Sequence, residues 1–218
     1  MSNWLNTTFY QFDFAVAKAF NALAQGASGI FTPIADLLAI LGKGGIFLLV
    51  LAVVLSLFKK TRKGGFCMLL AIGIGALFTN VFIKNFVARP RPYQASQEFR
   101  AFWEFVGAKT ESEYSFPSGH MTVATTSMTA LFLCFNKKWS FLGFVYALLT
   151  GASRIYLGVH YCTDVIGGMI IGLIAGTLAY LVIRWLFNLL ERKREVKFCS
   201  SLLNFSIVNL FRKKENKE

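Results

Sequence analysis

Two long stretches without a charged side chain restrict the folds open to this 218-residue chain more than any other feature. Residues 65–83 and 165–183 each supply the roughly 20 consecutive, mainly apolar residues that an α-helix needs to cross a bilayer. Hydrophobic residues make up 55% of the chain and charged residues only 16%, which leaves too little polar surface for a soluble globule of this size. The chain is therefore predicted to be an integral membrane protein.

Three further apolar segments, residues 44–58, 121–135 and 139–153, are somewhat shorter. Each reaches the length of a span if the Lys or Arg side chain at its end extends its charged head to the lipid headgroups. The sequence thus predicts an all-α, multi-pass helical bundle with about five transmembrane helices.

The formal net charge of +12 is compatible with binding to nucleic acid or with membrane topology, and the positions of the charges distinguish the two. The cations gather in three connections that fall on one side of the membrane: Lys59, Lys60, Arg62 and Lys63; Lys137 and Lys138; and Arg192, Lys193, Arg194 and Lys197. This excess of Lys and Arg predicts that their side is cytoplasmic. We therefore expect no nucleic-acid partner. The mainly acidic loop of residues 93–116 and the N-terminus are expected on the extracytoplasmic side.

Residues 1–42 contain no segment that is long and apolar enough to span the bilayer. Apolar side chains recur there at helical spacing, as in Phe14, Ala17, Phe20 and Leu23, which is typical of helices that lie in the membrane interface. The start of the chain lacks the basic region and cleavage site of a secretory signal. We expect N-terminal interfacial helices (1–42), a transmembrane domain (43–190) and a basic cytoplasmic tail (191–218).

Small residues indicate how the last predicted span packs. Gly168, Gly172 and Gly176 recur every four residues, so they share one side of a helix and permit the close approach of a neighbour. The four cysteines have no paired metal-ligand spacing and are interpreted as structural apolar thiols.

Three polar clusters lie at the predicted extracytoplasmic ends of the spans. They are Lys84, Arg89 and Arg91 in "KNFVARPRP"; Ser115, Ser118 and His120 in "SFPSGHM"; and Ser153, Arg154, His160 and Asp164 in "SRIYLGVHYCTD". Each cluster alone has a structural interpretation, because Lys and Arg anchor span ends and Pro-Ser-Gly begins helices. Anchoring cations favour the cytoplasmic side, however, so cations on the opposite side indicate another role.

The chemistry shared by these clusters is suited to a phosphate group. Lys84, Arg91 and Arg154 concentrate positive charge, and the planar guanidinium donates two parallel hydrogen bonds to phosphoryl oxygens. A helix that starts at Pro117 or Ser118 adds backbone N–H groups and the positive end of the helix dipole.

The two histidines suggest reaction rather than binding alone. If the last span begins near His160, His160 and Asp164 lie on one helical face, and the carboxylate can orient the imidazole as a nucleophile or general base. A buried histidine merely satisfied by a carboxylate is the structural alternative. His120, at another span end, is placed to protonate a leaving oxygen.

In these motifs the chain resembles the type 2 phosphatidic acid phosphatase family of membrane lipid phosphatases, which shares its site with vanadium haloperoxidases and glucose-6-phosphatase. The family pattern is Lys, six residues and Arg-Pro; Pro-Ser-Gly-His; and Ser-Arg, five residues, His, three residues and Asp. All three motifs are complete and in order within residues 84–164. Many relatives have six spans, so six is the alternative to five.

The resemblance implies a role for each matching residue. The residues implied to hold the transferred phosphoryl group are Lys84, Arg91, Ser118, Gly119 and Arg154. His160 is implied to be the nucleophile that forms a phosphohistidine, Asp164 its orienting partner, and His120 the general acid and then the base for water. The family uses no metal and no cofactor. Arg89 lies outside the motif and is interpreted as an anchor or an auxiliary contact.

The leading hypothesis is a multi-pass enzyme of the cell membrane that removes the terminal phosphate of a lipid at the extracytoplasmic face. Undecaprenyl diphosphate is the expected substrate, and phosphatidylglycerophosphate or phosphatidate is the alternative.

Aromatic residues of the 93–116 loop are expected to rest on the membrane and line a lipid entrance: Tyr93, Phe99, Phe102, Trp103 and Phe105. A non-enzymatic phosphate or lipid carrier is less consistent with groups at span ends, because carriers bind near the midplane. A haloperoxidase is disfavoured because the related oxidases are soluble.

Overall fold

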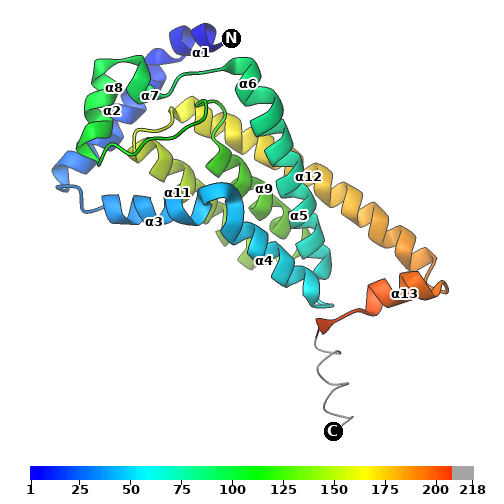
Figure 1. Ribbon diagram of the computed structural model, residues 1–218. Helices are drawn as coiled ribbons and strands as arrows, with labels where there is room; N and C mark the ends of the chain where they lie inside the picture. Colours follow the sequence, from blue (N-terminus) through cyan, green and yellow to red (C-terminus); the bar gives the residue numbers. More distant parts are fainter. Residues whose placement is uncertain (208–218) are drawn as a thin grey trace.

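A computed structural model describes residues 1–207, and every regular element in that part of the chain is helical (Figure 1). The elements are α1 (Ser2–Thr8), α2 (Tyr10–Gly26), α3 (Thr32–Gly42), the 3₁₀-helix η1 (Lys43–Gly45), α4 (Ile46–Leu57), α5 (Arg62–Ala76), the π-helix η2 (Leu77–Ile83), α6 (Lys84–Val87), α7 (Pro92–Ala95), α8 (Gln97–Phe105), α9 (Gly119–Cys134), α10 (Lys137–Ser140), α11 (Leu142–Tyr156), α12 (Cys162–Arg192) and α13 (Lys197–Asn204). The predicted all-α fold class is confirmed.

All five predicted spans lie on helices. Three segments are long and apolar enough to cross a membrane by length and composition: Thr32–Leu57, Arg62–Ala95 and Cys162–Arg192. Helices α9 and α11, with 16 and 15 residues, are shorter than a usual span. The count of five crossings therefore stays a prediction.

Helix α9 lies at the centre of the bundle and packs against α5, α11 and α12. The glycines of α12 make its contact with α9 close. A Cβ atom added at Gly172 would lie 2.6 Å from Thr125 Cβ, and one at Gly168 would lie 2.6 Å from the Ser118 carbonyl oxygen. The predicted packing face of glycines is confirmed, and it brings the start of α12 against the start of α9.

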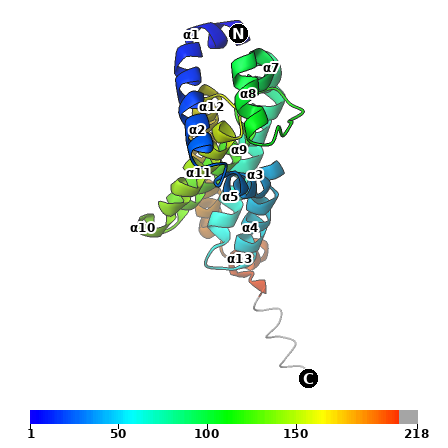
Figure 2. The ribbon, with the colours of Figure 1, turned by 90° about the vertical axis from the view of Figure 1, so that its left-hand side faces the viewer.

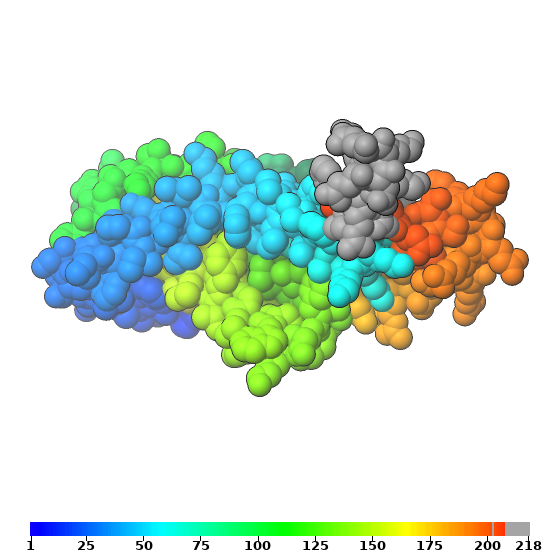
Figure 3. All heavy atoms as spheres, turned by 90° about the horizontal axis from the view of Figure 1, so that it is seen from below, coloured from blue at the N-terminus to red at the C-terminus, as the bar shows by residue number. Residues whose placement is uncertain are grey.

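Large apolar side chains cover the outside of the bundle. Val50 on α4, Leu148 on α11 and Trp185 on α12 are 57%, 59% and 63% exposed. Apolar exposure of this extent on several helices is what a lipid-facing surface requires. Seen from below in Figure 3, the N-terminal helices lie at one end of an elongated outline, and the C-terminal part of α12 and α13 lie at the other.

The chain changes direction sharply between α3 and α4. Gly44 and Gly45 both have left-handed backbones, with φ of 60° and 68°, which glycine adopts without a side-chain clash. Helix α3 consequently runs across the bundle while α4 continues along it (Figure 1).

The N-terminal helices α1 and α2 lie with α7 and α8 at the end of the molecule opposite α13 (Figure 2). Helix α2 packs against α8, α11 and α12. The interfacial location of residues 1–42 and the cytoplasmic location of residues 191–218 stay predictions, and residues 208–218 of that tail lie outside the described part.

Candidate active site

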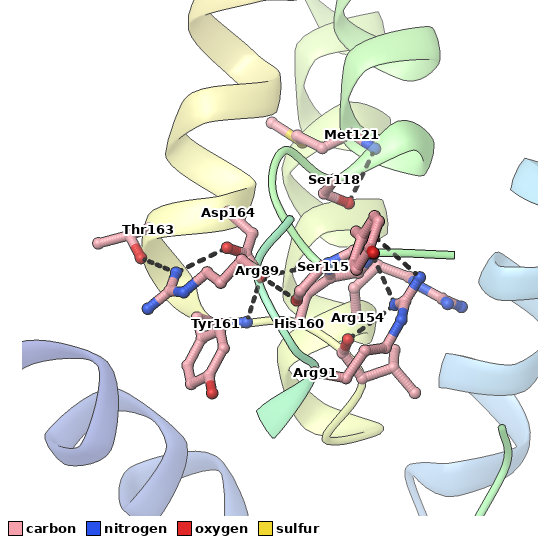
Figure 4. A network of polar contacts seen from close by, with 12 residues as sticks. Arg89, Arg91, Ser115, Ser118, Met121, Arg154, His160, Tyr161, Thr163 and Asp164 are labelled. Carbon is pink, nitrogen blue, oxygen red and sulfur yellow. Dashed lines mark hydrogen bonds and ion pairs between the residues drawn. The ribbon is translucent and has the colours of Figure 1, made fainter. Parts of the chain in front are cut away.

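Main-chain hydrogen bonds hold the three predicted clusters together. The Ser115 N–H donates to the Arg89 carbonyl (2.8 Å), which joins the first cluster to the second. The Ser118 N–H donates to the Asp164 carbonyl (3.0 Å), which joins the second to the third. The predicted convergence of the clusters is thus observed, and Figure 4 shows most of their side chains around His160.

His160 lies in the tight connection between α11 and α12. Its N–H and that of Val159 both donate to the Arg154 carbonyl, at 3.3 and 3.2 Å. Gly158 makes this turn with φ of 66°, and a Cβ atom there would lie 3.0 Å from Trp103 Cβ. Glycine is therefore required both for the backbone conformation and for the approach of α8.

One detail of the sequence prediction is wrong, because α12 begins at Cys162 and His160 precedes it. His160 and Asp164 meet because the Asp164 carboxylate turns back over the helix start. Its Oδ2 accepts from the Tyr161 N–H at 2.9 Å and lies 3.3 Å from His160 Nδ1. The expected pair forms by helix capping and not by a shared helical face.

The contacts of His160 define which ring nitrogen carries the proton. Arg91 Nη1 lies 3.2 Å from His160 Nε2, and a guanidinium can only donate, so Nε2 accepts. Nδ1 then carries the proton and donates toward Asp164 Oδ2. Ser115 Oγ also donates to Asp164 Oδ2, which fixes the carboxylate. The lone pair of Nε2 is thus directed to the cationic side of the site.

The imidazole of His160 is almost completely enclosed, with 3% of the residue exposed. Burial lowers the pKa of His160 well below its usual value, and the positive charges of Arg91 and Arg154 lower it further. His160 is therefore neutral at pH 7, as a nitrogen nucleophile must be.

The three predicted phosphate-binding cations all contact oxygen atoms of the segment 109–114. Lys84 forms an ion pair with Glu113, and Arg154 forms one with Glu111. Arg91 Nε donates to the Glu113 carbonyl at 2.8 Å. The cations are nearly buried, whereas the Glu111 and Glu113 side chains are 34% and 57% exposed. A buried cationic cradle is thus filled by carboxylates of a more exposed loop.

A cavity of about 300 Å³ adjoins this cradle. Its polar wall includes Lys84, Arg91, Gly119, His120 and His160. Its lining also includes apolar residues of α4, α5 and α9, namely Leu49, Ile72, Ala76 and Val123. One cavity therefore offers both charged and hydrocarbon-like surface.

His120 is the second residue of α9 and lines the same cavity. Its Nε2 lies 3.2 Å from the Ala39 carbonyl on α3, to which it donates. Gly42 leaves space for the ring, because a Cβ atom there would lie 2.6 Å from His120 Cδ2. Ser118, the residue before α9, is buried and accepts from the Met121 N–H as the helix N-cap. Its side chain holds the start of α9 in place.

Arg89, interpreted from the sequence as an anchor or an auxiliary contact, is not a membrane anchor. The residue has no exposed surface, and its guanidinium pairs with Asp164 and with Asp13 of α2. A role for Arg89 in the site could have been inferred from the sequence by the argument used for Arg91, because both cations lie in the "RPRP" segment on the predicted extracytoplasmic side. A role for Asp13 could not have been inferred, because nothing in its local sequence connects residue 13 to residues 89 and 164.

The expected membrane contact of the loop aromatics is wrong for most of them. Tyr93, Phe99 and Trp103 are buried, each less than 10% exposed. Tyr93 and Trp103 stack with ring centroids 4.5 Å apart, and Phe99 packs edge-on against Phe14 at 5.6 Å. These rings pack α7 against α8 and α8 against α2. Phe105 is more exposed, with 47% of the residue accessible.

The fold and the site define a helical membrane protein with a cationic cradle beside a buried histidine. A comparison with known families matches residues 64–188 to the PAP2 superfamily, and the chain belongs to it. Phosphatidylglycerophosphatase B of Bacillus subtilis is 34% identical over 159 residues, or 68% of this chain and 66% of that protein. An undecaprenyl-diphosphatase of Sulfolobus acidocaldarius is 32% identical over 54% of each chain.

Among solved structures, Aquifex aeolicus LpxE matches with a TM-score of 0.62 and 27% identity, covering 74% of this chain and 92% of that one. The PAP2 type phosphatidylglycerolphosphate phosphatase of Bacillus subtilis matches with a TM-score of 0.54 and 27% identity, covering 81% and 94%. The two curated relatives named above are matched over only about half to two thirds of their length.

The low pKa of His160 can be tested directly because the chain has only two histidines. In a His120→Gln variant with ¹⁵N-labelled histidine in detergent, we expect the remaining imidazole to stay neutral at pH 6. An ordinary histidine with a pKa of about 6.5 is mostly protonated at that pH. The unfolded variant is the control and should titrate near 6.5. A midpoint of 6.5 or higher in the folded protein would contradict the enclosed, cation-lined site.

The carboxylates in the cradle should compete with phosphate. Burial would raise the pKa of Glu111, but the positive charge of Arg154 outweighs this effect and holds the pKa below its usual value, so the carboxylate is ionised at neutral pH. Replacing Glu111 by Gln should therefore tighten inhibition by inorganic phosphate or orthovanadate by about two- to fivefold, the scale of a partly exposed ion pair. Glu104→Gln on the surface of α8 is the matched control, and weaker inhibition in Glu111→Gln would show that Glu111 helps to bind the anion.

Proposed function

We propose that this protein is a metal-independent lipid phosphatase that removes a terminal phosphate through a phosphohistidine. One observation carries the proposal. Lys84 and Arg91 from one segment and Arg154 from a distant one gather around anionic and carbonyl oxygens beside the unprotonated Nε2 of His160. Phosphoryl oxygens would take the places of those oxygens, and the phosphorus atom would then face the ring nitrogen.

In the first step the His160 Nε2 lone pair attacks phosphorus, and the bond from phosphorus to the lipid oxygen breaks. That oxygen takes a proton from His120 in its imidazolium form. Burial and the charge of Arg154 lower the pKa of His120 to about 4, and the negative charge of the bound phosphate group raises it so that His120 can bind this proton. The His160 ring gains positive charge as the bond forms, and the Asp164 carboxylate beside Nδ1 stabilises that charge. The three cations stabilise the equatorial oxygens of the transition state.

In the second step neutral His120 takes a proton from water while the water oxygen attacks phosphorus. The bond from phosphorus to Nε2 breaks, which releases phosphate and returns both histidines to their starting forms. Ser118 and Gly119 contribute the start of α9, where backbone N–H groups favour an anion. A Cβ atom at Gly119 would lie 3.7 Å from Lys84 Nζ, so glycine leaves this corner of the cradle uncrowded.

We also propose that the site faces the extracytoplasmic side of the cell membrane. The support is the Lys- and Arg-rich character of the α4–α5 and α9–α11 connections and of the C-terminal tail, which lie at the opposite ends of the spans. The same assignment places residues 1–42 in the outer interface and residues 191–218 in the cytoplasm.

Undecaprenyl diphosphate is the substrate that we propose first. Relatives named undecaprenyl-diphosphatase support it, and so does Lys43, which lines the cavity in addition to Lys84 and Arg91 and suits a second phosphoryl group. Phosphatidylglycerophosphate is the second candidate, because a 34% identical relative is named phosphatidylglycerophosphatase B. In both cases the apolar cavity wall would receive the start of the lipid chain.

Phosphate release by purified protein in detergent containing EDTA tests the activity and the substrate together. We expect release from undecaprenyl diphosphate to exceed that from phosphatidylglycerophosphate and phosphatidate. His160→Ala should lose at least about a thousandfold, the scale for a catalytic nucleophile. A fully active His160→Ala protein would overturn the mechanism. Tight binding of these lipids with no turnover would favour a carrier instead.

Cysteine labelling tests the side of the membrane. In a background without native cysteines, a membrane-impermeant maleimide applied to intact cells should label a Thr110→Cys variant and not a Lys60→Cys variant. Both positions are exposed and lie in the segments expected on opposite sides. Labelling of Lys60→Cys alone would reverse the proposed orientation.

A further inference from the structure

We propose that Asp13 and Arg89 are positioning residues. They orient Asp164, and they set the net charge that the group of Asp13, Arg89 and Asp164 presents to the His160 ring. The inference rests on the proposed function, because it assigns these residues a part in the reaction at that same site. It makes α2, an N-terminal helix outside the three motifs, a component of the active site.

All three nitrogen atoms of the Arg89 guanidinium donate hydrogen bonds to oxygen acceptors. Its Nε donates to Asn6 Oδ1 (2.8 Å) and its Nη2 to Asp13 Oδ2 (2.8 Å). Its Nη1 donates to both Thr163 Oγ1 and Asp164 Oδ1, each at 2.7 Å. The guanidinium also lies 3.6 Å from the centroid of the Tyr161 ring, a cation–π distance. Figure 4 shows Arg89 beside Asp164 and Thr163, apart from Arg91 and Arg154.

Asp13 completes this arrangement from the other side. Its Oδ1 accepts from the Thr163 N–H at 2.9 Å, and its Oδ2 accepts from Thr163 Oγ1 at 2.7 Å as well as from Arg89. Asp13 is 1% exposed and Asp164 is fully buried. Helix α2 is thereby bound to the first turn of α12, next to the carboxylate that contacts His160.

The alternating charges of Asp13, Arg89 and Asp164 explain how Asp13 would assist the reaction. Arg89 alone would neutralise Asp164 and weaken its interaction with a positive imidazole. Asp13 neutralises Arg89 in turn, so one negative charge remains available on the Asp164 side. The row of Asp13, Arg89, Asp164 and His160 then alternates in sign when the His160 ring becomes positive during attack.

The surroundings of His160 make this negative charge important. The cationic groups that act on the ring from the other elements are Lys84, Arg91, Arg154 and protonated His120, and each of them opposes a positive ring. The carboxylates of Glu111 and Glu113 line the same cavity but are paired with the cradle cations. Asp164 is the carboxylate in contact with Nδ1. Because the ring must gain positive charge in the first step, any loss of negative charge behind Asp164 should slow that step.

The test uses Asp13→Asn in the full-length protein in detergent, with Glu104→Gln as the control for the loss of one carboxylate. We expect kcat of Asp13→Asn to fall at least about tenfold, the scale on which buried orienting partners of an active histidine act. KM and inhibition by orthovanadate should stay within about twofold of the parent, because the cradle of Lys84, Arg91 and Arg154 is untouched. Asp13→Glu should recover part of kcat.

A second readout separates a positioning role from a structural one. In the His120→Gln background with ¹⁵N-labelled histidine, Asp13→Asn should move the His160 titration to lower pH, whereas Glu104→Gln should not move it. An Asp13→Asn, Arg89→Gln double variant should have a kcat no lower than that of the worse single variant, because both residues act through Asp164.

Failure of the positioning role and failure of the proposed function give different results. An unchanged kcat in Asp13→Asn, or a lower kcat that only follows the loss of folded protein while the His160 titration is unmoved, would overturn the positioning role. Absence of phosphatase activity in the parent would overturn the proposed function, and the titration would still report whether Asp13 is coupled to His160.

Discussion

The pairing of the charged side chains in this site follows from the cost of burying charge. Three cations and Arg89 lie almost fully enclosed at one end of an apolar bundle, where an unpaired charge is strongly unfavourable. The positive charges are neutralised in two different ways. The charge of Arg89 is neutralised by Asp13 and Asp164, which are both buried in the packed core. Lys84, Arg91 and Arg154 are matched by the carboxylates and carbonyls of a loop that is partly exposed. The first arrangement is structural, and in the second we propose that an incoming anion replaces the loop oxygens.

The packing of the helices brings these charged groups together beside the cavity. Close packing of α12 on α9 through glycine brings the turn before α12 against the start of α9, so His160, Asp164 and the N-terminus of α9 share one small volume. The kink at Gly44 and Gly45 carries α3 across the same region, where its Ala39 carbonyl contacts His120. The adjoining cavity is lined by both charged and apolar residues, a combination suited to the lipid phosphate that we propose as substrate.

Much of this was accessible from the sequence, and the remainder was not, for physical reasons. Apolar runs such as 165–183 indicated the spans, and the motif spacing identified the residues that converge, because both are properties of adjacent residues. The relation of His160 to Asp164 depended on where α12 begins, and the sequence placed that start too early. The inward packing of Tyr93, Phe99 and Trp103 and the pairing of Asp13 with Arg89 are contacts between distant segments. A pattern in one segment cannot show which other segment will cover it.

The central claim is that His160 Nε2 accepts the phosphoryl group from the lipid. It is tested most directly by mixing a His120→Asn variant with undecaprenyl diphosphate radiolabelled in its terminal phosphate and isolating the protein after a rapid quench. A phosphate leaving group depends less on the acid His120 than an alcohol would, whereas hydrolysis of the intermediate lacks its base, so a labelled protein should accumulate. The account predicts a label that is labile to acid, stable to alkali, located on His160 and lost in His160→Asn. A label on another residue, or one that persists without His160, would contradict it.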